Sequence, residues 1–465
     1  MTRPADLLLP DRGQPATALH LTDKKGFDAW LKGQPGRVRS AVKAQGFKGE
    51  GFQLAILPGE KEDWSAVLGV ADAASLSEFC LAKAAEALPE GSYRLAEGAP
   101  GTAALGWLLG QYAFDRFKKE PKTKGPRILL TAEPARIEEL VRLAEATFLA
   151  RDLINLPAGD LGPAELADAA AKLASDHDAK LSVVKGEALA KGYPMVHAVG
   201  AAAMPARAPR LIELEWGRAT DPVIAIVGKG VCFDSGGLDL KPAAGMRLMK
   251  KDMGGAAHAL ALAHLIMANR LPVRLQLLIP AVENAVSAEA FRPGDVLKSR
   301  AGLTVEIGNT DAEGRLILGD ALTRAGEHKP ELILDFATLT GAARVALGPD
   351  LPALFANDDS LATDLIAAGT KVSDPLWLLP LWKPYEEFFA SDIADFANAG
   401  DTPFAGTITA ALFLQKFVPA GLPWAHLDTF AWRASAKPGR PKGGDAVGLR
   451  AVWTMLAGRY PPRDT

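Results

Sequence analysis

Cysteine and histidine are scarce in this chain of 465 residues. The two cysteines, Cys80 and Cys232, lie far apart in the sequence, so neither a disulfide framework nor a CxxC metal site is available. The seven histidines are scattered, and His258 and His264 do not form an HExxH zinc motif. We interpret these two histidines as packing or helix-surface residues, and we expect a reducing compartment.

Long hydrophobic runs and a strong excess of one charge are also missing. The longest aliphatic region, residues 256–282, is interrupted by Arg270, Pro272 and Arg274, which argues against a membrane span. Near the N-terminus three leucines end at Pro10, a run too short for a signal peptide. The formal net charge is −3, so nucleic acid is not expected as the main partner. We therefore predict a cytoplasmic protein without a membrane partner.

The composition and length are those of a folded protein with more than one core. Apolar residues make up 48% and charged residues 23% of the chain, close to globular averages. A chain of 465 residues is too long for one ordinary core, so we expect two domains. The predicted fold class is α/β, with a small N-terminal α/β domain over 1–150 and a larger C-terminal α/β domain over 151–465. The larger domain is expected to have a central mixed sheet flanked by helices.

The C-terminal part alternates between strand-like and helix-like segments. We predict strands over 222–228, 273–282, 303–308 and 331–337, and helices over 254–268 and 315–327. Acidic residues cluster after these strands. In open α/β sheets ligands bind outside the carboxyl ends of the strands, so we expect the site at that edge.

Four of these acidic residues, Asp234, Asp252, Asp311 and Glu313, are candidate metal ligands. Any one aspartate taken alone is more often a turn or helix-cap residue. Four of them near successive strand ends instead favour a hard divalent cation, which needs several carboxylate oxygens.

Two other site chemistries have weaker support in the sequence. The glycine-rich stretch 228–259 contains no GxxxxGK[ST] or GxGxxG pattern leading directly into a helix, so a phosphate-binding loop is disfavoured. Ser235 lies in "FDSGG" and is not surrounded by a GxSxG elbow. A serine nucleophile is therefore a minor alternative.

Three motifs together resemble the leucine aminopeptidase family of dinuclear metal exopeptidases. They are "VGKGVCFDSGGLDLKP" (227–242), "MKKDM" (249–253) and "NTDAEGRL" (309–316). Further resemblance at 150–158, 290–297, 336–342 and 424–432 extends it over essentially all of the chain after about 150. The first domain resembles the family only loosely.

The resemblance implies two divalent metal ions about 3–4 Å apart, most often Mn²⁺ or Zn²⁺, which polarise one water between them. It implies that Asp234 and Glu313 bridge the ions, that Asp311 completes one site through its carboxylate and carbonyl, and that Lys229 and Asp252 complete the other. Lys229 must then bind as a neutral amine, and two neighbouring cations would depress its pKa enough to allow this.

By the same resemblance, Lys241 stabilises the charge of the tetrahedral intermediate and Arg315 holds a bicarbonate that assists proton transfer. The implied activity is removal of one residue at a time from peptides with a free N-terminus, by a homohexamer. A dinuclear phosphoesterase and a non-enzymatic binding or regulatory protein remain alternatives. The chain departs from the commonest family pattern at Cys232, where threonine is usual, at Asp239, where serine is usual, and over 437–451.

Overall fold

The computed structural model describes residues 3–120 and 124–461. The chain divides into two compact units. The first comprises residues up to Phe148 together with Ala434–Lys442, and the second comprises Leu149–Arg433 together with residues from Gly443 onward. Among the described residues, no helix is long and apolar enough to cross a membrane.

The first unit is built on a mostly parallel sheet in the order β1-β6-β5-β2-β4-β3, in which only the edge strand β3 runs antiparallel to its neighbour. Its strands are β1 (Leu8–Pro10), β2 (Thr17–Asp23), β3 (Leu54–Pro58), β4 (Trp64–Val70), β5 (Gly91–Leu95) and β6 (Arg127–Thr131). Its helices include α1 (Phe27–Lys32), α2 (Gly36–Ala44), α3 (Ala82–Ala87) and α4 (Ala103–Leu109). Trp107 of α4 and Tyr93 of β5 are fully buried in its core.

One segment of the first unit comes from the far end of the chain. Within Ala434–Lys442, the backbone N–H of Gly439 donates to Glu86 Oε1 at 2.8 Å, and the Arg440 guanidinium lies over the Phe79 ring at 4.4 Å. The strands on either side of this segment, β19 (Trp432–Arg433) and β20 (Gly443–Gly444), pair antiparallel. The segment is therefore the tip of a hairpin.

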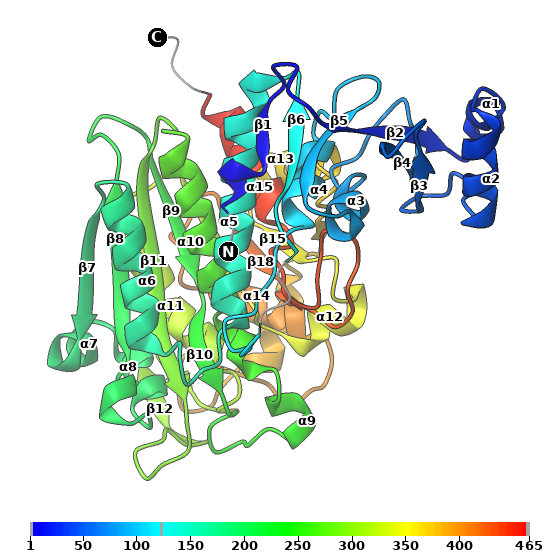
Figure 1. The fold of residues 1–465 in the computed structure, drawn as a ribbon. Helices are drawn as coiled ribbons and strands as arrows, with labels where there is room; N and C mark the ends of the chain where they lie inside the picture. The colour runs from blue at the N-terminus through cyan, green and yellow to red at the C-terminus, as the bar shows by residue number, and fades with distance from the viewer. Residues whose placement is uncertain (1–2, 121–123, 462–465) are drawn as a thin grey trace. The chain divides into compact units, whose positions relative to one another are not determined.

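The second unit has a mixed central sheet in the order β16-β15-β18-β14-β9-β11-β8-β7, with β10 also paired to β11 (Figure 1). Strands β18, β14, β9 and β11 run parallel, whereas β8, β7 and β15 pair antiparallel. The strands of this sheet are β7 (Lys180–Lys185), β8 (Arg210–Trp216), β9 (Val223–Gly228), β10 (Gly230–Asp234), β11 (Arg274–Asn284), β14 (Leu332–Ala337), β15 (Ala353–Ala356), β16 (Trp377–Leu378) and β18 (Trp424–Asp428). A separate small sheet joins β12 (Val296–Lys298), β13 (Thr304–Glu306) and β17 (Phe396–Ala397).

Helices cover both faces of the central sheet. The helices of this unit include α5 (Ile137–Asn155, which begins in the first unit), α6 (Pro163–Asp176), α7 (Gly186–Gly192), α8 (Pro194–Gly200), α9 (Ala243–Met246), α10 (Gly254–Ala268), α11 (Glu313–Glu327), α12 (Gly341–Leu347), α13 (Asp359–Lys371), α14 (Gly406–Gln415) and α15 (Leu449–Arg459). In β9, Ala225 and Val227 belong to the core that includes α8, α11 and α14. Side chains alternate along a strand, and Gly228 lies against Ala256 of α10 on the opposite face. This architecture confirms the predicted α/β fold class.

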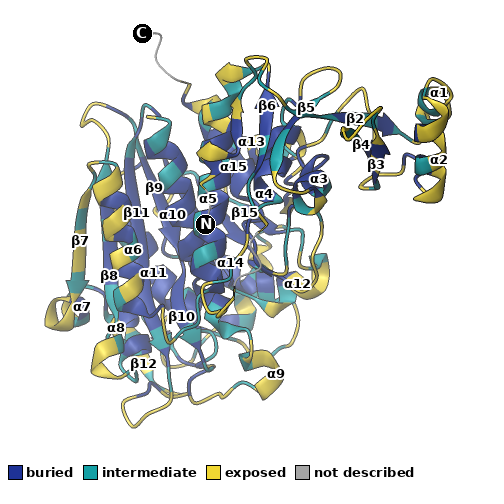
Figure 2. Cartoon of the chain, viewed as in Figure 1, coloured by how far each residue is buried: buried dark blue, intermediate teal, exposed yellow. Residues whose placement is uncertain are grey.

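The burial pattern explains why the core elements were readable from the sequence. Strand β14 is buried along its whole length, and nearly every residue of α10 is buried (Figure 2). An element enclosed on all sides must be apolar all round, which produces the long hydrophobic runs of the sequence. The helix predicted over 254–268 is confirmed by α10. Helix α11 begins two residues before the predicted start, at Glu313.

Candidate metal centre

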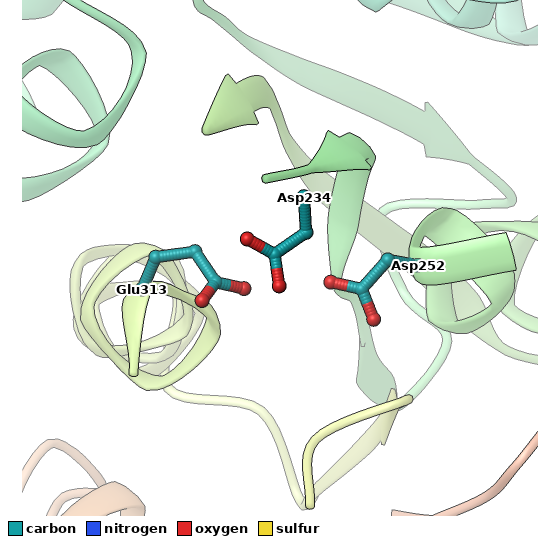
Figure 3. A group of neighbouring side chains, drawn as sticks. All are labelled: Asp234, Asp252 and Glu313. Carbon is teal, nitrogen blue, oxygen red and sulfur yellow. The ribbon is translucent and has the colours of Figure 1, made fainter. Parts of the chain in front are cut away.

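Three buried carboxylates face one another in the second unit. Ligand oxygens of Asp234, Asp252 and Glu313 all lie within 4.8 Å of one another, and the three side chains point toward a common space (Figure 3). Asp234 is the last residue of β10, and Glu313 is the first residue of α11. The expectation that the acidic residues follow successive strands of one sheet is wrong for Asp252, which lies in a 3₁₀ helix, η4 (Met249–Met253).

Asp311 also differs from that expectation. The loop that carries Asp311 and Glu313 follows β13, which belongs to the small sheet and not to the central one. The acids therefore converge from three kinds of local structure, a strand end, a 3₁₀ helix and a loop leading into a helix.

Lys229 lies among these carboxylates, between β9 and β10. Its Nζ is 2.6 Å from Asp252 Oδ2 and 2.9 Å from Glu313 Oε1, and it donates to the carbonyl of Thr338 at 3.3 Å. Burial lowers the pKa of Lys229, but the two carboxylates outweigh that effect and hold its pKa above the ordinary value. The close approach requires Gly314, because a Cβ there would lie 2.7 Å from Nζ.

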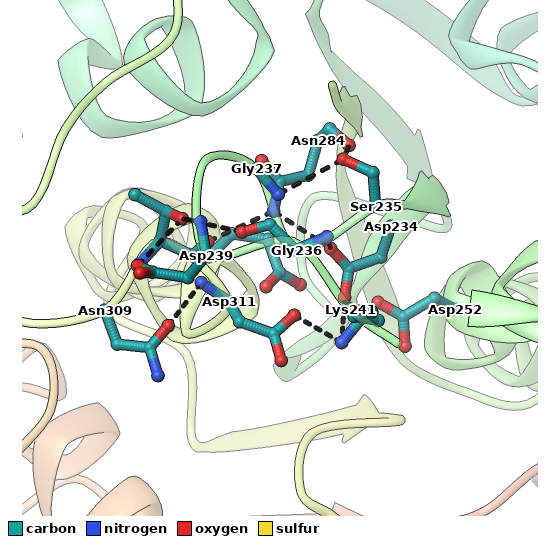
Figure 4. Close-up of polar contacts among 12 residues, drawn as sticks. Asp234, Ser235, Gly236, Gly237, Asp239, Lys241, Asp252, Asn284, Asn309 and Asp311 are labelled. Carbon is teal, nitrogen blue, oxygen red and sulfur yellow. Dashed lines mark hydrogen bonds and ion pairs between the residues drawn. The ribbon is translucent and has the colours of Figure 1, made fainter. Parts of the chain in front are cut away.

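A second lysine, Lys241, faces the other two acids. Its Nζ is 2.9 Å from Asp234 Oδ2 and forms an ion pair with Asp311 (Figure 4). Burial and the charge of Asp234 raise the pKa of Asp311 to about 6, and the same two causes raise the pKa of Glu313 to about 8. Buried carboxyl groups that lie close together resist ionisation, so nearby positive charge is needed to keep this cluster ionised.

Hydrogen bonds orient the carboxylates. Asp234 Oδ1 accepts from the backbone N–H of Gly236 and from Asn284 Nδ2, both at 2.9 Å. Asp252 Oδ1 accepts from Thr338 Oγ1 at 2.7 Å. The sequence did not single out Asn284 or Thr338 as site residues, although Thr338 lies within the 336–342 resemblance.

The departure at Asp239 has a structural explanation. Its Oδ2 accepts from the backbone N–H of Thr310 at 2.7 Å and from Thr310 Oγ1 at 3.0 Å. The N–H of Asp239 in turn donates to Thr310 Oγ1 at 2.9 Å. Asp239 therefore joins the glycine-rich loop to the loop that carries Asp311.

Arg315 is half-buried on α11 beside the cluster. Its Nη1 donates to the carbonyl of Asn398 at 2.6 Å, and its guanidinium lies 5.9 Å from the centre of the Phe413 ring. Burial lowers the pKa of Arg315 to about 10, so the group keeps its charge at neutral pH. Arg315, Lys229, Lys241 and Asp311 all line one cavity of about 750 Å³.

The donor set suits a hard divalent cation. Asp252 Oδ2, Asp311 Oδ1 and Glu313 Oε1 are buried and have only lysine ammonium groups as described partners. Buried carboxylate oxygens need compensation, and a cluster of such oxygens is the usual environment of divalent cations.

The minor alternatives lose support from the geometry. Ser235 Oγ donates to the carbonyl of Asn284 at 2.8 Å, which commits its proton to the backbone. His258 is fully buried and contacts the carbonyl of Gly254 through Nδ1 at 2.7 Å, as a packing residue does.

Comparison with known sequences identifies the two units. Residues 148–453 match the catalytic domain of the cytosol aminopeptidase family, and residues 17–130 match the N-terminal domain of M17 aminopeptidases. The chain belongs to the cytosol aminopeptidase family. It is 44% identical over 381 residues to a probable cytosol aminopeptidase of Syntrophotalea carbinolica, covering 77% of this chain and 76% of that protein. A probable cytosol aminopeptidase of Chlorobium limicola is 36% identical over 459 residues, covering 90% and 91%.

Solved structures of cytosol aminopeptidases and their relatives agree. The cytosol aminopeptidase of Coxiella burnetii superposes with a TM-score of 0.92 at 45% sequence identity, covering 97% of this chain and 99% of that one. The bottromycin maturation enzyme BotP in complex with Mn gives a TM-score of 0.86 at 33% identity, covering 98% and 100%. The cytosol aminopeptidase family is one of metallo-exopeptidases, in accord with the predicted class of enzyme.

Proposed function

We propose that this chain removes N-terminal residues from peptides by metal-assisted hydrolysis at the cavity beside Asp234, Asp252 and Glu313. The observation that carries the proposal is the convergence of these buried carboxylates with Asp311 and two lysines on one cavity. Membership of the cytosol aminopeptidase family supports the reaction type.

The residues that would hold two ions are those that the family resemblance implies. Asp234 and Glu313 would be shared, Asp311 would complete one site, and Asp252 with Lys229 would complete the other. When bound, the ions supply an activated water and a ligand position for the substrate's free amino group. Mn²⁺ and Zn²⁺ are the proposed occupants, and the Mn complex of the related BotP supports the first of these.

Lys241 and Arg315 would act on charge without binding metal. Lys241 lies at the cavity wall, and its pKa is raised because Asp234 and Asp311 outweigh the effect of burial, so it stays charged. A fixed ammonium there would stabilise the oxyanion that develops on the scissile carbonyl. Arg315 stays charged, is anchored on Asn398, and would hold bicarbonate for proton transfer.

We further propose a cytoplasmic homohexamer, as the family resemblance implies. Trp377, Trp382 and Phe404 are large apolar side chains that remain more than half exposed in the single chain. Apolar side chains that gather into one contiguous exposed patch are typical of surfaces covered in an assembly, so these three residues are the first positions to test for a subunit contact.

The proposed function is tested with leucine amide, N-acetyl-leucine amide and a phosphate monoester. Metal-loaded protein is expected to hydrolyse the first, to lose most turnover on the second because acetylation removes the amine ligand, and to leave the third intact. Chelation should abolish the activity and added Mn²⁺ or Zn²⁺ should restore it. Equal rates on the acetylated substrate, or phosphatase activity alone, would overturn the proposal.

A further inference from the structure

One lysine in the cavity has no role in the proposed chemistry. Lys251 is only 4% exposed and lies in η4 immediately before Asp252, yet it lines the same cavity as Lys229 and Lys241. Its neighbour Lys250 takes a different course, because its Nζ donates to the carbonyl of Asn155 at 2.6 Å and it does not line that cavity.

The Lys251 nitrogen lacks an acceptor among the described residues. The carboxylate oxygen it faces, Asp252 Oδ1, is 3.9 Å away, beyond hydrogen-bond distance, and that oxygen accepts from Thr338 Oγ1 instead. Its other contact is the ring of Phe430, whose centre lies 4.9 Å from Nζ. A cationic nitrogen with three donor positions and no acceptor, on a side chain that is almost fully buried, carries a desolvation cost that a bound ligand would relieve.

The other acid near Lys251 is already occupied. Asp428 accepts from the backbone N–H groups of Leu339 and Thr340, and also from Thr340 Oγ1 at 2.6 Å and Thr407 Oγ1 at 3.3 Å. These donors hold the Asp428 carboxylate, at the end of β18, against the loop that follows β14.

A second cation reinforces the positive character of this wall. The guanidinium of Arg344 also lies over the Phe430 ring, 4.8 Å from its centre, and Arg344 lines the cavity as an exposed residue of α12. The ring thus holds two cationic side chains at the cavity surface, and both are available to an anionic group.

We propose that Lys251 is a specificity-determining residue that binds the side-chain carboxylate of an acidic N-terminal residue, with Arg344 adding to the attraction. This inference rests on the proposed function and names its substrate class. An acceptor that hydrogen-bonds Lys251 lies roughly 7 Å or less from Asp252 Oδ1, given 3.9 Å to Nζ and about 3 Å for the bond. That distance suits the side chain of the residue being removed better than the remote end of a peptide.

The test compares glutamyl, glutaminyl and leucyl amides, which have no C-terminal carboxylate, on metal-loaded wild type and Lys251→Met. Methionine keeps the length and apolar body of the lysine but removes the nitrogen. The ratio of kcat/KM for the glutamyl amide to that for the leucyl amide should fall by about 10- to 100-fold, the usual loss for a hydrogen bond to a charged group. The glutaminyl amide should lose less, because its acceptor is neutral.

Lys250→Met is the matched control, since it removes a lysine nitrogen from the same turn outside the cavity, and its ratio should match wild type. The inference would be overturned if the glutamyl-to-leucyl ratio of kcat/KM in Lys251→Met were within about twofold of the wild-type ratio. It would also be overturned if wild type cleaved the leucyl amide but not the glutamyl amide. Wild type that cleaves none of the amides would instead refute the proposed function. Metal content measured on each variant separates lost specificity from lost metal.

Discussion

Replacing Lys241 by methionine should separate charge stabilisation from metal binding. Lys241 Nζ lies 2.9 Å from Asp234 Oδ2 and pairs with Asp311, so the ammonium occupies oxygens that the proposed ions need. Removing it from protein treated with chelator leaves two facing carboxylates without their cation. The free energy of unfolding should then fall by about 1–2 kcal/mol, a moderate value because the Asp311 side chain is 32% exposed.

The same substitution should not weaken metal binding. A metal cation competes with Lys241 for Asp234 and Asp311, so Lys241→Met should bind metal at least as tightly as wild type. If the lost ion pairs had stabilised the metal-free state by about 1.4 kcal/mol, the metal affinity should rise by about tenfold. Turnover should nevertheless fall by about 10²- to 10³-fold, because the oxyanion loses its fixed charge. Lys229→Met should behave in the opposite way, with lower metal occupancy and partial rescue by excess metal.

The assay combines elemental analysis of bound metal, steady-state kinetics on leucine amide, and urea unfolding with and without chelator. If Lys241→Met loses metal in proportion to its activity, so that the rate per bound ion is unchanged, Lys241 is a metal-site residue and does not stabilise the oxyanion. Lys250→Met is the control for loss of a lysine near the site, because its nitrogen bonds the backbone of Asn155.

Three further results are expected. Gly314→Ala should reduce metal content and activity together, because its Cβ would meet Lys229 at 2.5–2.7 Å; normal metal content in that variant would contradict the packing. Asp335→Asn should lower the free energy of unfolding by about 3 kcal/mol, because buried Asp335 accepts from Trp424 Nε1 and pairs with His426 at 2.5 Å. Burial lowers the pKa of His426, but Asp335 outweighs that effect and raises the pKa above its ordinary value. The ion pair therefore stabilises the fold fully below pH 6.5, and this stabilisation is lost as the pH rises through the raised pKa. Urea unfolding of wild type and Asp335→Asn should show a smaller difference in unfolding free energy at alkaline pH than at acid pH. Adding Mn²⁺ or Zn²⁺ at 100 times its dissociation constant should raise the unfolding free energy by about 2.7 kcal/mol, and an unchanged melting temperature would argue against a folded-state metal site.

The core elements were predictable because their signal is local. Strand β9 and helix α10 are enclosed by other elements, so each is apolar in nearly every residue and can be recognised from ten to fifteen consecutive positions. The position of Asp252 was not predictable in this way. Its 3₁₀ helix is short and follows a loop, and neither has a hydrophobic period to identify it.

The residues that support the candidate site were harder to find. Asn284 reaches Asp234 across 50 positions, Thr338 reaches Asp252 across 86, and Asn398 receives Arg315 across 83. Asparagine and threonine are common in turns, so their presence in the sequence does not indicate a site. The place of Lys251 is unpredictable for a related reason, because the sequence "MKKDM" does not say which of its two lysines lines the cavity.

The hairpin tip at Ala434–Lys442 limits how this protein can be divided. The first unit is made from two stretches of polypeptide. Deleting the residues up to Phe148 would therefore leave Arg440 without Phe79 and Gly439 without Glu86. A free-standing catalytic unit therefore needs a second cut, with Arg433 joined to Gly443 through a short turn, because these two residues are already paired across the hairpin. For the same reason, an exchange of N-terminal units between relatives preserves packing only when both stretches are transferred together.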